Sequence, residues 1–285
     1  MLRRKAPPIP VRKFLIGLVC LANFGSAAPA QERVFIPSFA DMQQRPAKPD
    51  SAALRPIRFV TEDDYPPFHF ALSDGQLAGF NIDIARAICE ELQVSCTIQR
   101  RQWDMLGAAL ADNSADAVIA SMAMTAQARQ TYEFSQPYYA TPARFVTTKA
   151  SPLTEATPEA LAGKKIGVVA GSAHEAYLER FFPKSQREAF ADVSALRAAV
   201  ADARVDAGFA DGVGLAIWLN GEGAGCCAFR GGPYTESRYF GEGVGVALRK
   251  GDANLRRAID YALARLSQRG VYGDLYLKWF PVGFY

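Results

Sequence analysis

The sequence has little histidine, no block of basic residues after its first segment, and no later apolar run long enough for a membrane span. His69 and His174 are the only two histidines among 285 residues. So few imidazole ligands make a metal site improbable, and we expect neither a metal nor another cofactor. The lack of a Lys/Arg cluster argues against nucleic acid as a partner. Because a bilayer-spanning helix needs roughly 20 apolar residues, we expect a soluble mature chain.

Residues 1–30 have the pattern of an export signal. Five basic residues precede the apolar run 14–21, and the small residues at 28 and 30 provide a cleavage site. An uncleaved anchor is the alternative, but the run is too short to span a bilayer. We expect the mature chain to begin near Gln31. Removing the five basic residues of the signal leaves 27 Lys/Arg against 29 acidic residues, a net charge of about −2.

Export permits disulfides, so the remaining cysteines can be considered in pairs. Cys89 and Cys96 are seven residues apart across the end of a predicted helix, a spacing that can close a short loop. Two buried thiols are the alternative for this pair. Cys226 and Cys227 are adjacent. The sequence leaves open a vicinal disulfide, a free pair or an intermolecular link between two chains.

The apolar content of 49% is ample for one large core or two modest ones. Residues 31–55 are polar and interrupted by proline, which predicts a flexible N-terminal extension. From Ile57 onward, short apolar runs alternate with helical patterns, which indicates an α/β fold with a mostly parallel sheet. Strands are predicted at 57–60, 96–99, 117–120, 144–148, 165–169, 205–209 and 244–248. Helices are predicted at 82–92 with Asn81 as N-cap, and at 103–110, 174–181, 194–203, 212–219, 254–268 and 272–280.

Two α/β series of similar length predict two lobes, with a ligand cleft at the carboxyl ends of their strands. Five segments follow in a characteristic order and spacing: 61–68, 79–83, 124–139, 163–171 and 206–211. Read together, they resemble the amino-acid-binding proteins of bacterial ABC transporters, and the resemblance covers residues 57–280. Among these proteins the chain looks most similar to the periplasmic binders of lysine/arginine/ornithine and histidine. Cys89 and Cys96 stand where those proteins carry a disulfide.

The resemblance implies a two-lobed, type II periplasmic-binding-protein-like fold. Lobe 1 would comprise residues 56–141 and 243–285, and lobe 2 residues 142–242, with hinge strands near Thr141 and Glu242. It also implies a periplasmic, monomeric protein that is not an enzyme. Such a protein captures a small-molecule ligand, here a basic amino acid or a derivative, and delivers it to the membrane permease of an ABC transporter.

Two other functions are compatible with this fold. A periplasmic cyclohexadienyl or arogenate dehydratase would need a general acid in the cleft. The candidate acids Glu62, Glu175 and Asp211 have no evident partner base in the sequence. A ligand-sensing module that reports to a membrane partner is the third possibility, and the lack of a signalling domain in the sequence disfavours it.

Asp211 matches the family carboxylate that pairs with the α-ammonium group of the ligand. A buried ammonium needs an opposite charge, so an aspartate at a strand end suits this role. The alternative role for Asp211 is to cap the helix that follows it. Residues 171–174 end a strand and open a helix, where free backbone N–H groups can hold a carboxylate. Ala173 there offers only its N–H, and His174 would line the cleft unless it is a surface residue of its helix.

Tyr65 and Trp103 match the two positions that enclose the side chain of the ligand, and Glu62 matches an acidic position near its far end. Aromatic faces with a carboxylate suit a cation, and a planar guanidinium especially. The alternative for Trp103 is a core position in its helix.

The sequence departs from the family where the carboxylate of the ligand is bound. The clamping arginine of the family falls at position 128, which is Ala128 here, and Arg129 follows one residue later. One helical residue turns a side chain by about 100°, so Arg129 reaches the site only if the turn adjusts. Ala120 and Ala123 replace hydroxyl residues beside Ser121. A ligand with a different head group, such as an opine or a polyamine-like amine, stays open.

Overall fold

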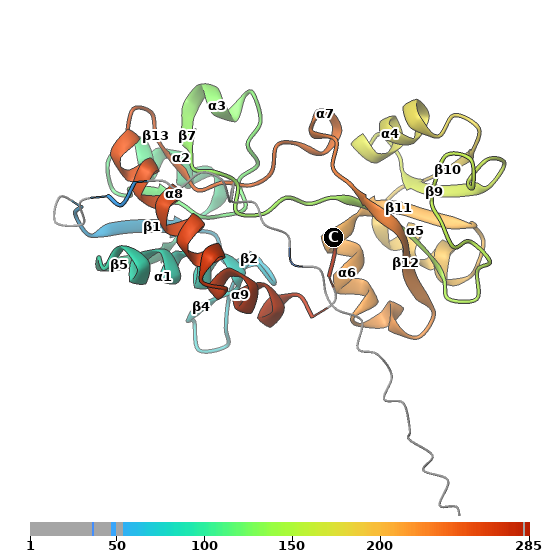
Figure 1. The fold of residues 1–285 in the computed structure, drawn as a ribbon, viewed down its shortest axis with the longest axis horizontal. Coiled ribbons are helices and arrows are strands. Elements are labelled where there is room, and N and C mark those ends of the chain that lie inside the picture. The colour runs from blue at the N-terminus through green and yellow to red at the C-terminus, as the bar shows by residue number, and fades with distance from the viewer. Residues whose placement is uncertain (1–35, 37–46, 50–53, 282) are drawn as a thin grey trace, which may run out of the picture. The chain divides into compact units, whose positions relative to one another are not determined.

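The computed structural model describes residues 36, 47–49, 54–281 and 283–285. The predicted signal segment 1–30 lies outside the described residues, and so does most of the predicted extension 31–55. From residue 57 onward the chain forms an α/β fold (Figure 1). Among the described residues, no helix has both the length and the apolar character that a membrane crossing requires.

The first five-stranded sheet has the order β5-β1-β6-β13-β7. Strand β1 pairs in parallel with β5 and with β6, whereas β13 is antiparallel to both of its neighbours. Helices α1 and α2 form the crossovers between the parallel strands, as parallel pairing requires. The bounds are β1 (Ile57–Thr61), α1 (Phe80–Leu92), β5 (Cys96–Arg100), α2 (Trp103–Ala111), β6 (Ala117–Val118), β7 (Tyr132–Phe134) and β13 (Ala247–Arg249).

The second sheet has the order β10-β9-β11-β8-β12. Strand β9 pairs in parallel with β10 and β11, and β8 is antiparallel to β11 and β12. Its elements are β8 (Ala143–Thr148), β9 (Lys165–Val169), α4 (Ala173–Phe181), β10 (Gln186–Phe190), α5 (Val193–Ala201), β11 (Ala207–Asp211), α6 (Gly212–Leu219) and β12 (Cys227–Tyr234). Half of the strand pairings in each sheet are antiparallel, so the prediction of a mostly parallel sheet was wrong: both sheets are mixed.

The remaining elements lie outside these two sheets. Strands β2, β3 and β4 form a small antiparallel sheet after β1. Helices α8 and α9 pack on α1 and on each other. The bounds are β2 (Asp64–Tyr65), β3 (His69–Ala71), β4 (Leu77–Ala78), α3 (Ala128–Thr131), η2 (Glu222–Ala224), α7 (Ser237–Phe240), α8 (Ala253–Gln268) and α9 (Val271–Trp279).

Alternating residues of the second sheet fill two apolar clusters. Phe145 and Phe209 face a cluster with Leu178 of α4, whereas the adjacent residue Val146 faces Leu196 of α5. This alternation follows from the pleat, because successive side chains of a strand point to opposite faces. Both faces of the second sheet are therefore covered by helices.

The chain crosses twice between the residues of the two sheets. The first sheet uses residues 57–134 and 247–249, and the second uses 143–234. Thr141 and Glu242 themselves lie outside the strands, although β8 begins at Ala143 and Val244 forms β-bridges, and the hinge at these positions stays a prediction. Gly241 and Gly243, which flank Glu242, have φ angles of 82° and 104° that interrupt extended backbone. The lobe boundaries at 141/142 and 242/243 stay a prediction.

A β-bridge between Tyr139 and Val244 joins the two crossing segments. The backbone N–H of Val244 donates to the Tyr139 carbonyl at 2.8 Å, and the Tyr138 N–H donates to the Val244 carbonyl at 2.9 Å. The two crossing segments are thus joined by backbone hydrogen bonds at Val244.

The start of α1 corrects a second prediction. Gly79, not Asn81, is the N-cap, and it has a φ of 127°. A Cβ atom on Gly79 would lie 2.3 Å from the Phe68 carbonyl oxygen, so the close approach requires glycine. Asn81 is instead the second helical residue and is fully buried.

Candidate functional site

Glu62 and Trp103 lie together at the start of α2. Burial, and next the charge of Asp64, raise the pKa of the Glu62 carboxyl, while a hydrogen bond from the Trp103 backbone opposes the shift. The dipole of α2 also favours a carboxylate at its N-terminus. The Trp103 side chain is 50% exposed, so the alternative of a core tryptophan does not hold.

Tyr65 stands on a set of stacked aromatic rings. Its ring stacks on Phe68 at 5.2 Å between centroids, and Phe68 stacks on Tyr139 at 4.8 Å. Phe68 and Tyr139 are buried, whereas Tyr65 remains 48% exposed. Tyr65 therefore has a fixed base and an accessible surface, which is the arrangement that an aromatic binding platform needs.

A buried polar network fixes Ser121. Asn81 Nδ2 donates to Ser121 Oγ at 3.0 Å and lies 2.9 Å from His69 Nδ1. The Tyr138 hydroxyl donates to Asn81 Oδ1 at 2.9 Å. Ser121 has a φ of 56°, unusual for a residue with a side chain, and these hydrogen bonds support that backbone.

His69 is neutral within this network. Burial lowers its pKa to about 4, although the charges of Asp64 and Asp63 act in the opposite direction. A neutral ring can accept a hydrogen bond at Nδ1, which matches the amide of Asn81 as its donor. The network therefore contains no buried charge.

Asp211 caps α6, as the alternative for this residue anticipated. Its Oδ1 accepts from the Gly214 N–H at 2.8 Å. Burial raises the Asp211 pKa, and hydrogen bonds from Gly214 and Thr141 oppose the rise. Burial, and next the charge of Asp211, raise the pKa of Tyr65. Asp211 is thus electrostatically coupled to the aromatic platform.

The turn before α4 differs from the predicted free backbone. Ser172 caps the helix by accepting from the Glu175 N–H at 3.2 Å. Glu175 Oε2 in turn accepts from the Gly171 N–H at 2.7 Å. This reciprocal pair occupies the Gly171 N–H, and the carboxylate site at 171–174 stays a prediction. Ala173, the first helical residue, is exposed.

His174 packs against two aromatic rings. Its ring centroid lies 5.7 Å from that of Phe209 and 5.2 Å from that of Phe240. Burial lowers the His174 pKa to about 4, so the ring is neutral at pH 7. The His174 ring therefore packs into the protein rather than lying free on the surface of α4. Being neutral, it would not repel a cationic ligand.

Arg129 forms an ion pair with the second crossing segment. Its Nη2 and Nε atoms donate to Glu242 Oε2 at 2.6 and 3.0 Å. Its guanidinium carbon also lies 5.8 Å from the centre of the Phe134 ring. Ala128, at the family's arginine position, donates its N–H to Thr125 Oγ1 at 3.0 Å. Ala123 is exposed and is paired with Val244 in a β-bridge.

The structure joins only part of the predicted site by direct interactions. Hydrogen bonding links Ser121 to Tyr139, whose raised pKa is due first to burial and also reflects the charge of Asp211. Sequence reasoning missed Asn81, His69 and Tyr139 as supports of these residues. The sequence offered one signal for this network, the polar residue Asn81 on an otherwise apolar face of its helix. In the described part of the chain, no three His, Cys, Asp or Glu residues gather as a possible metal site.

Two mixed sheets covered by helices, a half-buried carboxylate and an exposed aromatic platform define a protein that binds a small polar solute. The family of bacterial extracellular solute-binding proteins, family 3, matches residues 57–282, and the chain belongs to this family. The predicted resemblance and the predicted class of fold are confirmed. Because this is a family of binding proteins, the dehydratase alternative loses its support.

Individual relatives agree with this assignment. The chain is 37% identical to the L-arginine-binding protein of Pseudomonas aeruginosa over 83% of this chain and 92% of the relative. It is 34% identical to the lysine/arginine/ornithine-binding periplasmic protein of Escherichia coli, over 80% and 89%. The L-cystine solute receptor of Neisseria gonorrhoeae shares the fold, with a TM-score of 0.70 at 21% identity over 81% and 94% of the two chains.

Proposed function

We propose that this protein binds a basic amino acid or a close derivative in the periplasm and delivers it to the membrane permease of an ABC importer. The names of its relatives support this ligand class, since they bind arginine, lysine/arginine/ornithine or histidine. The observation that carries the proposal is the half-buried carboxylate of Asp211, whose charge acts on Tyr65. A carboxylate beside an aromatic ring suits a cation.

The cationic groups of the ligand would have separate partners. Asp211 would bind the α-ammonium group through the carboxylate oxygen that does not cap α6. Tyr65 and Trp103, each about half exposed, would enclose the side chain. Glu62 would face the distal cation, whose charge would relieve the desolvation that raises the Glu62 pKa.

The carboxylate of the ligand would meet weaker partners. Ser121 offers a hydroxyl held by Asn81, and Ala173 offers a backbone N–H at the start of α4. Ala123 and His174 would contribute surface without charge. Arg129 would reach the carboxylate only by leaving Glu242. This end of the site therefore tolerates a modified head group better than the cationic end does.

Calorimetry with arginine, lysine, ornithine and histidine tests the proposal. Asp211→Asn keeps a helix-capping oxygen but removes the charge, so it separates the two roles of this residue. Asp192→Asn is the matched control, because Asp192 caps α5 through the Ala195 N–H at the same distance of 2.8 Å.

We expect wild type and Asp192→Asn to bind at least one of these amino acids. Asp211→Asn should bind it at least about tenfold more weakly, a loss of roughly 1.4 kcal/mol. Equal affinity of the two variants would remove Asp211 from the site. No uptake of any basic amino acid by the wild type would refute the ligand class.

A further inference from the structure

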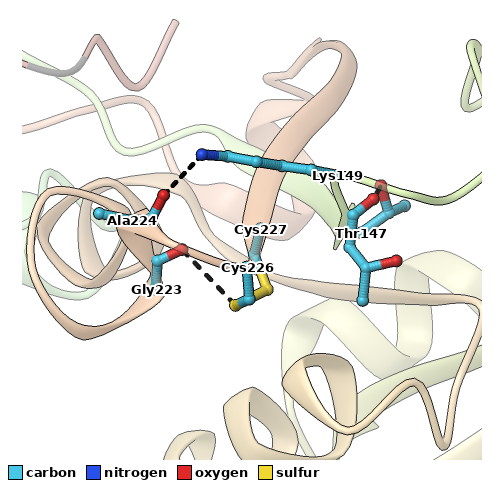
Figure 2. Close-up of a disulfide and its surroundings, with 7 residues drawn as sticks. Thr147, Lys149, Gly223, Ala224, Cys226 and Cys227 are labelled. Atoms are coloured by element: carbon cyan, nitrogen blue, oxygen red, sulfur yellow. Dashed lines mark hydrogen bonds between the residues drawn. A yellow bond between two sulfur atoms is a disulfide. The ribbon is translucent and has the colours of Figure 1, made fainter.

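Cys226 and Cys227 form a disulfide between adjacent residues where η2 leads into β12 (Figure 2). The other disulfide, Cys89–Cys96, ties α1 to β5 across seven positions of sequence. A disulfide limits the unfolded chain by closing a loop, and this effect grows with loop length. The Cys226–Cys227 bond closes no chain segment, so it has little of this stabilising effect.

Backbone hydrogen bonds hold the same turn without help from the sulfur atoms. The Lys149 N–H donates to the Cys226 carbonyl at 2.7 Å, and the Cys226 N–H donates to the Gly223 carbonyl at 3.3 Å. Cys227 pairs with Thr148 in the ladder between β12 and β8. The Lys149 ammonium donates to the Ala224 carbonyl at 2.6 Å (Figure 2). Opening the disulfide therefore leaves the fold of this turn supported.

The two sulfur atoms differ in their surroundings. Cys227 is 3% exposed and belongs to an apolar cluster with Val146 and Trp218. Cys226 is only half-buried, and its Sγ lies 3.5 Å from the Gly223 carbonyl oxygen. An incoming thiolate must approach a sulfur in line with the bond that it breaks. Cys226 Sγ is the atom that it can reach, and Cys227 is then the leaving group.

We propose that Cys226–Cys227 is a reversible thiol–disulfide exchange site for a dithiol reductant. One thiolate of the dithiol attacks Cys226 Sγ, forms a mixed disulfide there, and displaces the Cys227 thiolate, which takes up a proton. The second thiol of the dithiol then attacks the mixed disulfide as its thiolate and releases Cys226. The protein gains two electrons and two protons, and the dithiol becomes a disulfide. Cys89–Cys96 stays oxidised.

Graded reduction of the full folded protein with dithiothreitol, followed by alkylation and peptide mass spectrometry, tests the proposal. We expect the labels to appear on Cys226 and Cys227 at a dithiol concentration at least tenfold below that which labels Cys89 and Cys96. Circular dichroism should stay unchanged at that lower concentration. A monothiol should give a mixed disulfide on Cys226 rather than on Cys227, which fragment ions distinguish.

Two variants and a reversal step complete the test. Cys226→Ala/Cys227→Ala should take up no label at the lower concentration, and Cys89→Ala/Cys96→Ala should label as the wild type does at 226 and 227. Removal of the dithiol and addition of its oxidised form should restore the disulfide. Labelling of all four cysteines together, labelling only on unfolding, or free thiols at 226 and 227 in the untreated protein would each overturn the proposal.

Discussion

The Arg129 guanidinium and the Glu242 carboxylate form an ion pair of 2.6 Å between residues that are 113 positions apart in the sequence. Arg129 lies in α3, and Glu242 lies in the second crossing segment. Both side chains are substantially exposed, so the pair itself adds little to stability. Glu242 would compete with the carboxylate of a ligand, because both would bind the same Arg129 guanidinium.

Arginine and agmatine test this competition, because agmatine is arginine without its carboxylate. Arg129→Ala should weaken arginine binding about tenfold and leave agmatine binding unchanged, since roughly 1.4 kcal/mol is a reasonable loss for one charge-assisted hydrogen bond. Glu242→Gln should tighten arginine binding by freeing the guanidinium. Calorimetry measures both ligands, with Arg187→Ala as control because Arg187 pairs only with Glu179 among the ion pairs of the described residues. Equal losses for arginine and agmatine would exclude a carboxylate contact.

Trp103 should matter for binding and hardly at all for folding. Its side chain is half exposed, so Trp103→Ala should change the free energy of unfolding by less than about 1 kcal/mol. The affinity for arginine should fall about thirtyfold, because a desolvated guanidinium–tryptophan contact contributes about 2 kcal/mol. Met105→Ala is the matched control, since Met105 lies in the same helix and is equally exposed at 50%. A loss of affinity in both variants would point to a general defect of α2.

His69 makes stability depend on pH. Burial holds its pKa at about 4 in the folded state, below the roughly 6.5 of an unfolded chain. The folded protein therefore keeps this ring neutral between these values while the unfolded chain takes up a proton. The free energy of unfolding should therefore fall by about 3 kcal/mol as the pH decreases from 6.5 to 4. His174, with a pKa of about 4, adds to the same window.

Urea unfolding at pH 4.5, 5.5 and 7 measures this dependence. His69→Asn keeps an acceptor for Asn81 but cannot be protonated, so it should show a shallower decrease between pH 6.5 and 4.5 than the wild type. His174→Gln should also reduce the decrease, and the double variant should reduce it most. An unchanged slope in His69→Asn would mean that His69 is not the titrating group.

The sequence was informative where a continuous apolar run was clearly bounded. The ranges of β9 and α6 agree with the predicted 165–169 and 212–219. Among the missed strands, β7, β10 and β12 lie at the edges of the two five-stranded sheets. Edge strands need no continuous apolar pattern, and β12 even contains Gly231, Gly232 and Pro233, which favour turns elsewhere.

The sequence could nominate single residues for the candidate site but not the network that supports them. Family spacing selected Asp211, Tyr65 and Trp103. It could not reveal that Asn81 connects His69, Ser121 and Tyr138, because these contacts join residues up to 57 positions apart. It also could not reveal that Glu175 folds back onto Gly171, since side-chain direction decides that hydrogen bond.

The two disulfides should differ sharply in what they contribute to stability. Cys89–Cys96 closes a loop across seven positions, for which chain entropy gives about 2 to 3 kcal/mol. Cys89→Ala/Cys96→Ala should lose about that amount in urea unfolding. Cys226→Ala/Cys227→Ala also removes one half-buried and one buried sulfur. It should nevertheless lose less, under about 1.5 kcal/mol, because no chain loop is released. If the second variant were the less stable of the two, the structural role assigned to Cys89–Cys96 would be contradicted.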